Sequence, residues 1–191
     1  MYKDIDSSDF IPCLFFQGMS KKVMIHFHAN GEDLSHTQSL MTRFCIEFMF
    51  NVICVEYPGY GIYNESNPNI KKSQQIIIDA ETVYNYVIDY FKLDHKDIMV
   101  SGRSIGSGPA CHLAATFNPL CLLLISPIKS VSHIARQLCG RITDFLLEER
   151  FNNIEVVKKV KCPSIIVHGM KDNMVLFKDS IEILLKGFIN C

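Results

Sequence analysis

The stretch DIMVSGRSIGSGPA (97–110) places Ser104 between Gly102 and Gly106, in the pattern G-x-S-x-G. An apolar run precedes the pattern and a helical pattern follows it, as in the strand–turn–helix unit that presents a nucleophilic serine. Glycines allow such a turn to close, and the N–H of Ile105 at the helix start can stabilise a developing oxyanion. The alternative is a serine that only caps a helix after a strand.

A second stretch, HFHANGEDL (26–34), directly follows another apolar run. In a hydrolase whose nucleophilic serine lies in such a strand–turn–helix unit, the loop after this earlier strand supplies the other oxyanion N–H. Asn30 occupies the donor position. We expect His28 to fix this loop by hydrogen bonding and not to act as the base. Glu32 and Asp33 are expected to cap the helix that follows.

A third stretch, PSIIVHGMKDNMV (163–175), reads as a strand followed by a loop that carries Asp172. An acid after a late strand follows the order Ser, Asp, His of the serine hydrolases with an α/β sheet. Its role would be to orient an imidazole and to stabilise it when charged. His168, just before the loop, is expected to be structural.

The base that such a triad needs has no obvious candidate. No histidine follows Asp172, and all seven histidines precede it: His26, His28, His36, His95, His112, His133 and His168. The sequence therefore predicts a nucleophile and an acid without the residue that should connect them.

The elements that must position these residues alternate along the chain. Apolar runs predict strands at 13–16, 22–28, 51–57, 97–101, 120–125 and 164–168. Helical patterns predict helices at 35–50, 73–91, 105–117 and 177–187. In the first of these the apolar residues Leu40, Phe44 and Phe48 recur at a spacing of four, and Ser73 is expected to cap the second. Apolar strands separated by helices indicate a mostly parallel sheet with helices on both faces, in a single domain over residues 1–191 with a small cap segment at 128–158.

Composition excludes several other classes of function. Apolar residues make up 48% of the 191 residues, the net charge is -1, and no cluster of basic residues suggests a nucleic-acid partner. No apolar run reaches the length of a transmembrane segment, and the first residues do not form a signal peptide. The eight cysteines lie mostly in apolar runs without a C-x-x-C pair, so we expect buried thiols in a reducing compartment and not four disulfides.

Taken together, five segments resemble one family. HANGEDL, VEYPGYGIYNESNPN, DIMVSGRSIGSGPA, LLLISPIKS and CPSIIVHGMKDNMV match, in this order, segments of α/β-hydrolase fold serine hydrolases of the alpha/beta-hydrolase-domain-17 (Bem46-like) type. The resemblance covers about residues 10–185. It implies the α/β-hydrolase fold, with Ser104 as the nucleophile, Asp172 as the triad acid, and Asn30 and Ile105 as the oxyanion-hole donors, without a metal or cofactor.

The resemblance also implies a substrate class. The better-known branch of this family removes palmitoyl groups from proteins, which predicts hydrolysis of an acyl ester or thioester, a palmitoylated protein among the substrates, and a cytoplasmic, membrane-associated location. Two features depart from the family. His28-Ala29 stands where His-Gly is usual, and the cysteine-rich N-terminal segment that anchors the depalmitoylating branch is absent from this sequence.

Three explanations for the missing histidine remain open. The first is an active serine hydrolase shortened at the C-terminus, so that the last strand and helix of an incomplete α/β-hydrolase domain are lacking. The second is a catalytically inactive protein that keeps the fold and acts in binding or regulation. The third is recruitment of another histidine, such as His133 of the cap segment or one from a partner chain.

Overall fold

A computed structural model describes residues 10–63, 71–139 and 151–187. These residues include all the residues proposed above for chemistry. Part of the expected cap segment, residues 140–150, lies outside the described residues, and so do Cys191 and the loop residues 64–70.

A six-stranded sheet forms the centre of the molecule, in the order β1-β3-β2-β4-β5-β6. All neighbouring pairs are parallel except β1 with β3, which is antiparallel. The strands are β1 (Cys13–Phe16), β2 (Val23–Phe27), β3 (Asn51–Val55), β4 (Ile98–Arg103), β5 (Cys121–Ile125) and β6 (Ser164–Val167). The mostly parallel sheet predicted from the apolar runs is confirmed.

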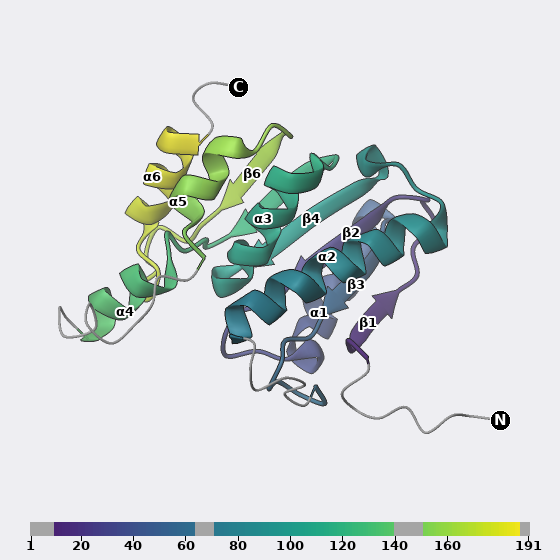
Figure 1. The fold of residues 1–191 in the computed structure, drawn as a ribbon, viewed down its shortest axis with the longest axis horizontal. Coiled ribbons are helices and arrows are strands. Elements are labelled where there is room, and N and C mark those ends of the chain that lie inside the picture. The colour runs from purple at the N-terminus through teal and green to yellow at the C-terminus, as the bar shows by residue number, and fades with distance from the viewer. Residues whose placement is uncertain (1–9, 64–70, 140–150, 188–191) are drawn as a thin grey trace.

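Helices cover both faces of this sheet, as Figure 1 shows. The helices are α1 (Leu34–Phe48), α2 (Lys72–Phe91), α3 (Ser107–Phe117), α4 (Val131–Cys139), α5 (Asn153–Val156) and α6 (Phe177–Gly187). In the view of Figure 1, α2 and α3 lie in front of the sheet and α1 lies behind it. The order of strands and helices predicts that the loops after β2, β4 and β6 meet at one edge of the sheet.

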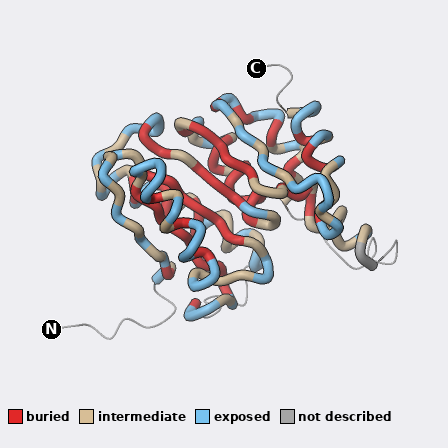
Figure 2. Tube along the Cα trace, turned by 180° about the vertical axis from the view of Figure 1, so that it is seen from behind, coloured by how far each residue is buried: buried red, intermediate tan, exposed pale blue. Residues whose placement is uncertain are grey.

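Two apolar clusters correspond to the two faces, and Figure 2 shows the buried central strands. The larger cluster joins α2 and α3 to the sheet and includes Tyr84 and Phe27, both fully buried. The smaller cluster joins α1 to β2 and β3 through Met41 and Cys45. Complete burial of both faces explains why β2 and β3 are apolar at nearly every position.

The helix predicted at 35–50 is confirmed as α1, whereas the predicted cap of α2 needs correction. The buried residues of α1 are Thr37, Met41 and Cys45, whereas Leu40 is 39% exposed and Phe48 is 56% exposed. The apolar stripe of this helix is broader than the side that contacts the sheet, so spacing alone does not fix the buried line. Helix α2 begins at Lys72 without a side-chain cap, and Ser73 lies inside it.

The edge strand β6 is less covered than the central strands. Its residues alternate in burial, and Ile165 and Val167 are 52% and 53% exposed. The six cysteines whose side chains the structure describes are all free, and five of them are buried, as expected, while Cys13 is exposed. No helix within the described ranges has the length and apolar character that crossing a membrane requires.

Candidate functional site: a strained serine turn

The turn after β4 has the backbone that the G-x-S-x-G pattern predicts. Ser104 has φ of 52°, in the left-handed region that non-glycine residues rarely adopt. A Cβ at Gly102 would lie 2.2 Å from the carbonyl oxygen of Gly106, and a Cβ at Gly106 would lie 2.2 Å from the carbonyl oxygen of Phe27. Both glycines are therefore required by close backbone approach, and the strain at Ser104 is imposed by its surroundings.

A buried polar group supports this turn from below. The hydroxyl of Ser107, in the first turn of α3, donates to the carbonyl oxygen of Ser104 at 2.5 Å. The side-chain amide of Asn153, which is fully buried, donates to the Ser107 hydroxyl at 2.9 Å and to the Ile128 carbonyl at 2.9 Å. These contacts connect three segments distant in sequence, and no motif in the sequence indicated them.

The loop after β2 lies directly beside the serine turn, because β2 and β4 are paired with Phe27 opposite Gly102. His28 is fully buried, as expected for a residue that fixes the loop. Its Nδ1 donates to the Ala29 carbonyl at 2.9 Å, and its Nε2 is hydrogen-bonded to Glu56 Oε1 at 2.8 Å. Since both ring nitrogens are occupied, His28 is not available as a base.

Glu56 ties this loop to two other segments. Its carboxylate also accepts the backbone N–H of Tyr57 at 3.1 Å and that of Leu34 at 3.2 Å, at the start of α1. The hydroxyl of Tyr57 in turn donates to the His28 carbonyl at 2.8 Å. The buried Glu56 thus holds the ends of β2 and β3 and the first turn of α1 in one arrangement.

Asn30 lies at the corner of a tight turn in this loop. The N–H of Glu32 donates to the Ala29 carbonyl at 3.1 Å, which closes a turn with Asn30 and Gly31 at its centre. The Asn30 side chain accepts a hydrogen bond from the hydroxyl of Tyr60 at 2.7 Å. The side chain is therefore engaged, and the backbone N–H is the group of Asn30 considered for chemistry.

The two acidic residues of the loop differ in role. Asp33 caps α1 as predicted, since its side chain accepts from the N–H groups of Ser35 and His36. The prediction that Glu32 also caps this helix is wrong. Its Oε2 accepts the N–H of Ala29 at 3.0 Å, and its Oε1 accepts from the guanidinium of Arg103. The reason is tertiary, since Arg103 lies 71 residues away in sequence on the neighbouring strand.

Asp172 lies in the loop after β6, two strands along the sheet from β4. Its Oδ1 accepts the N–H groups of Met174 at 2.9 Å and Val175 at 3.0 Å. Partial burial favours the neutral acid, but the hydrogen bonds from these two amides outweigh it and hold the pKa of the Asp172 carboxyl below its usual value. The carboxylate is therefore ionised at neutral pH, as orienting an imidazole requires.

His168 is held beneath this loop, with its side chain 1% exposed. Its Nδ1 is 2.6 Å from the Ser180 hydroxyl, and its Nε2 donates to the Val175 carbonyl at 2.8 Å. Asp172 Oδ2 is 3.6 Å from the same Nε2. Because Val175 occupies that nitrogen, His168 supports the Asp172 loop, in keeping with the structural role expected for it.

The remaining histidines have partners elsewhere in the fold. His133 Nε2 lies 3.3 Å from the carboxylate of buried Asp179 and 2.9 Å from the Gln137 amide. The other four are hydrogen-bonded to other side chains: His26 to Ser101, His36 to Asp33, His95 to Tyr84 and His112 to Glu81. Within the part of the chain that the structure describes, no hydrogen bond joins a histidine to the Ser104 hydroxyl.

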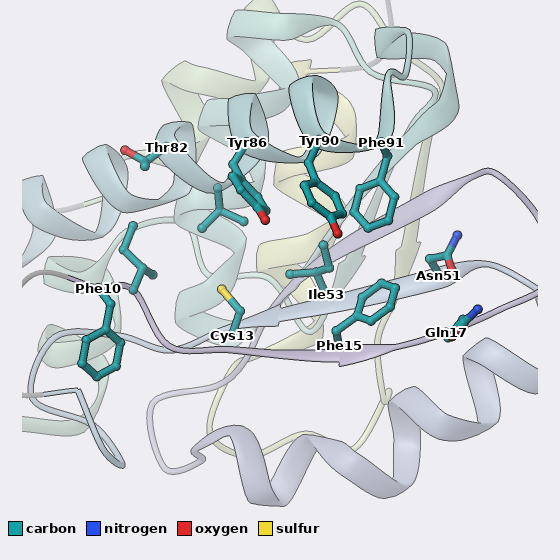
Figure 3. A pocket seen from close by; sticks show the side chains of 12 residues that line it. Phe10, Cys13, Phe15, Gln17, Asn51, Ile53, Thr82, Tyr86, Tyr90 and Phe91 are labelled. Atoms are coloured by element: carbon teal, nitrogen blue, oxygen red, sulfur yellow. The ribbon is translucent and has the colours of Figure 1, made fainter. Parts of the chain in front are cut away.

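An apolar cleft of about 860 Å³ lies elsewhere, between β1 and α2. Aromatic side chains from both elements point into it, as Figure 3 shows for Phe15, Tyr86 and Tyr90. The lining residues are Phe10, Ile11, Cys13, Phe15, Gln17, Asn51, Ile53, Thr82, Val83, Tyr86, Tyr90 and Phe91. Neither Ser104 nor Asp172 is among them, so this cleft is separate from the serine turn.

Sequence comparison finds relatives over most of the chain. The chain is 28% identical over 160 residues to the alpha/beta hydrolase domain-containing protein aho-3 of Caenorhabditis elegans, covering 84% of this chain and 46% of that protein. It is 24% identical over 175 residues to the human alpha/beta hydrolase domain-containing protein 17B, covering 91% of this chain and 58% of that protein. The chain thus spans about half the length of the curated relatives it matches. No protein-family model matches it.

Solved structures agree with the fold. An esterase of Pyrococcus furiosus superposes with a TM-score of 0.72 at 15% identity, covering 93% of this chain and 71% of that chain. A monoacylglycerol lipase of Paleococcus ferrophilus superposes with a TM-score of 0.67 at 14% identity, covering 94% and 85%. At these identities the superpositions establish the shared fold.

Proposed function

We propose that this chain, which has the α/β-hydrolase fold, is a serine hydrolase that cleaves an acyl ester or thioester through an acyl-enzyme on Ser104. The observation that carries the proposal is the backbone of Ser104. Ser104 has a left-handed backbone conformation and lies between two glycines where backbone atoms leave no room for a Cβ. This combination is typical of a nucleophile turn. A serine that only caps a helix needs neither the strain nor the close approach.

The proposed reaction assigns one step to each element of the site. The Ser104 oxygen attacks the acyl carbonyl, and a base accepts its proton. The negative charge on the tetrahedral intermediate is held by the N–H groups of Ile105 and Asn30. The ester alkoxide or thiolate leaves with a proton, and water then releases the acid from the acyl-enzyme. Asp172, ionised at neutral pH, would orient and stabilise the imidazolium of a triad.

The proposed substrate class is supported by the structural neighbours and by the resemblance in sequence. The structural neighbours named above are an esterase and a monoacylglycerol lipase, both of which cleave carboxylic esters. The sequence segments shared with the alpha/beta-hydrolase-domain-17 type favour a long-chain thioester, such as palmitoyl-cysteine of a protein. Comparing a palmitoyl thioester with an ester of the same acyl chain separates these two substrates.

A second candidate function rests on a specific observation. Each described histidine is bonded to another residue, and none is bonded to Ser104. Without a base the serine is a weak nucleophile. The chain would then keep the fold and the loop after β2 (residues 28–33) and would act as a binding or regulatory protein.

Labelling with a fluorophosphonate serine-hydrolase probe distinguishes the two functions. We expect the folded chain to be labelled and Ser104→Ala to abolish the labelling. Ser164→Ala, which alters a half-buried serine at the start of β6, is the matched control and should be labelled as the unaltered chain is. Labelling that persists in Ser104→Ala would refute the assignment of the nucleophile. Absence of labelling in a cooperatively folded chain would favour the binding function.

A further inference from the structure

We propose that Glu32 is a positioning residue that joins the serine turn to the loop after β2 and holds Ala29, the residue whose carbonyl shares a peptide unit with the Asn30 N–H. The inference rests on the proposed function, because it assigns a role relative to Ser104 and Asn30. It adds a connection between the turn that carries Ser104 and the loop that carries Asn30, which neither the G-x-S-x-G pattern nor the resemblance indicates.

The two oxygens of Glu32 contact the two halves of the site. Oε1 accepts from the Arg103 guanidinium, and Arg103 is the residue immediately before Ser104. Oε2 accepts the N–H of Ala29 at 3.0 Å, and Ala29 is the residue immediately before Asn30. One carboxylate thus holds the residue before the proposed nucleophile Ser104 and the residue before the proposed donor Asn30.

The peptide groups of Ala29 are held on each side. Its N–H is bound by the Glu32 side chain, and its carbonyl accepts both the Glu32 N–H at 3.1 Å and the His28 Nδ1–H at 2.9 Å. The Ala29 carbonyl and the Asn30 N–H belong to the same planar peptide unit. The backbone N–H of Glu32 and the ring of His28, which hold the Ala29 carbonyl, therefore also set the direction of the Asn30 N–H. The Glu32 side chain holds the preceding peptide unit through the Ala29 N–H, so Ala29 is fixed on both sides of its Cα.

Partial burial makes this contact different from an ordinary surface ion pair. The Glu32 side chain is 19% exposed and the Arg103 side chain is 46% exposed. Exposed ion pairs contribute little to global stability. If the Ala29 N–H loses its acceptor, the backbone next to the proposed donor Asn30 changes its geometry. Misplacement of reacting groups has a large effect on the reaction rate. We therefore expect the effect of Glu32 on reaction rate to exceed its effect on thermal stability.

Two substitutions separate the two contacts of Glu32. Glu32→Ala removes both the acceptor for Ala29 and the partner of Arg103. Glu32→Gln keeps an amide oxygen that can accept the Ala29 N–H but loses the charge that pairs with Arg103. The control is Glu155→Ala, because Glu155 is also a carboxylate in an ion pair, with Lys158 at 2.7 Å on the surface.

Amide hydrogen exchange at Ala29 and the rate of fluorophosphonate labelling at Ser104 are the two measurements. In Glu32→Ala we expect exchange at Ala29 to rise at least tenfold and labelling to slow at least about fivefold. The loss should be smaller than the roughly 100-fold loss that follows deletion of an oxyanion donor. Glu32→Gln should retain most of the protection at Ala29 and label at an intermediate rate. Glu155→Ala should match the unaltered chain in both measurements.

The exchange measurement decides the positioning role independently of catalysis. Unchanged exchange at Ala29 in Glu32→Ala would overturn the inference, and so would an unchanged labelling rate in a chain that is labelled. If no variant is labelled at Ser104, the proposed function fails. Faster exchange at Ala29 in Glu32→Ala alone would then still support the connection made by Glu32.

Discussion

Substitution of Gly106 by alanine tests the proposed origin of the serine turn. The added Cβ would lie 2.2 Å from the Phe27 carbonyl oxygen, 2.7 Å from the Phe27 carbonyl carbon and 2.8 Å from the His28 carbonyl oxygen. All three atoms are backbone at the end of β2, so rotation of a side chain cannot relieve the contact. Overpacking of this kind costs about 3 kcal/mol when neighbouring backbone has to move. For a chain of this length, that cost lowers the melting temperature by roughly 6–12 °C.

Thermal unfolding followed by circular dichroism measures this change. The matched control is Gly169→Ala, because a Cβ at Gly169 meets no atom within 4 Å. The control should unfold at the same temperature as the unaltered chain or slightly above it, since alanine restricts the unfolded chain. A melting temperature for Gly106→Ala within about 2 °C of the control would show that the β2–β4 approach is looser than the structure indicates. The explanation of the strain at Ser104 would then be wrong.

Two further predictions concern stability. Ser104→Gly should stabilise the chain by about 1 kcal/mol in urea denaturation, because glycine adopts the left-handed conformation without strain. Ser104→Ala keeps the Cβ and is the control. Equal stability of the two variants would contradict a strained turn. Burial, aided by the charges of His28 and Arg103, lowers the pKa of His26 to about 3. Because only the unfolded state gains this proton between about pH 3 and pH 6.5, stability should fall with decreasing pH below about 6, by up to ~1.4 kcal/mol per pH unit. His26→Gln should reduce that slope in urea titrations at pH 7, 6 and 5, and an unchanged slope would assign the effect to other groups.

The sequence was most informative where one residue type satisfies a local requirement. Only small residues fit at positions 102 and 106 of the serine turn, and an apolar strand before it and a helix after it leave little choice of backbone. The same holds for Asp33, whose short carboxylate reaches the free amides at the start of α1. For Gly102 and Asp33 the interaction spans only a few residues, so the local pattern contains the partners. Gly106 is conspicuous in the same pattern, although the backbone that it approaches belongs to Phe27 and His28 at the end of β2.

Contacts between distant segments could not be predicted in this way. Glu32 resembles a helix cap in sequence, and its true partner Arg103 becomes visible only when β2 and β4 pair. Asn153 has no feature in sequence that connects it to Ser107, 46 residues earlier. The buried side of α1 depends on tertiary contacts in the same way. Which part of a broad apolar stripe faces the sheet depends on where the helix is docked.

Catalysis by Ser104 would require both a turn that presents its hydroxyl and a base that accepts its proton, and the structure separates these two conditions. The strained turn is held by Gly102 and Gly106 and by the Ser107 hydroxyl, and none of these contacts involves the side chain of a histidine. The geometry of the nucleophile is therefore established independently of any base that would accept its proton. A folded chain that is not labelled at Ser104 would lack activation and not shape, which is the condition expected of the binding function. Labelling that depends on Ser104 would instead show that a base reaches the hydroxyl, and it would direct attention to the space between Ser104 and Asp172.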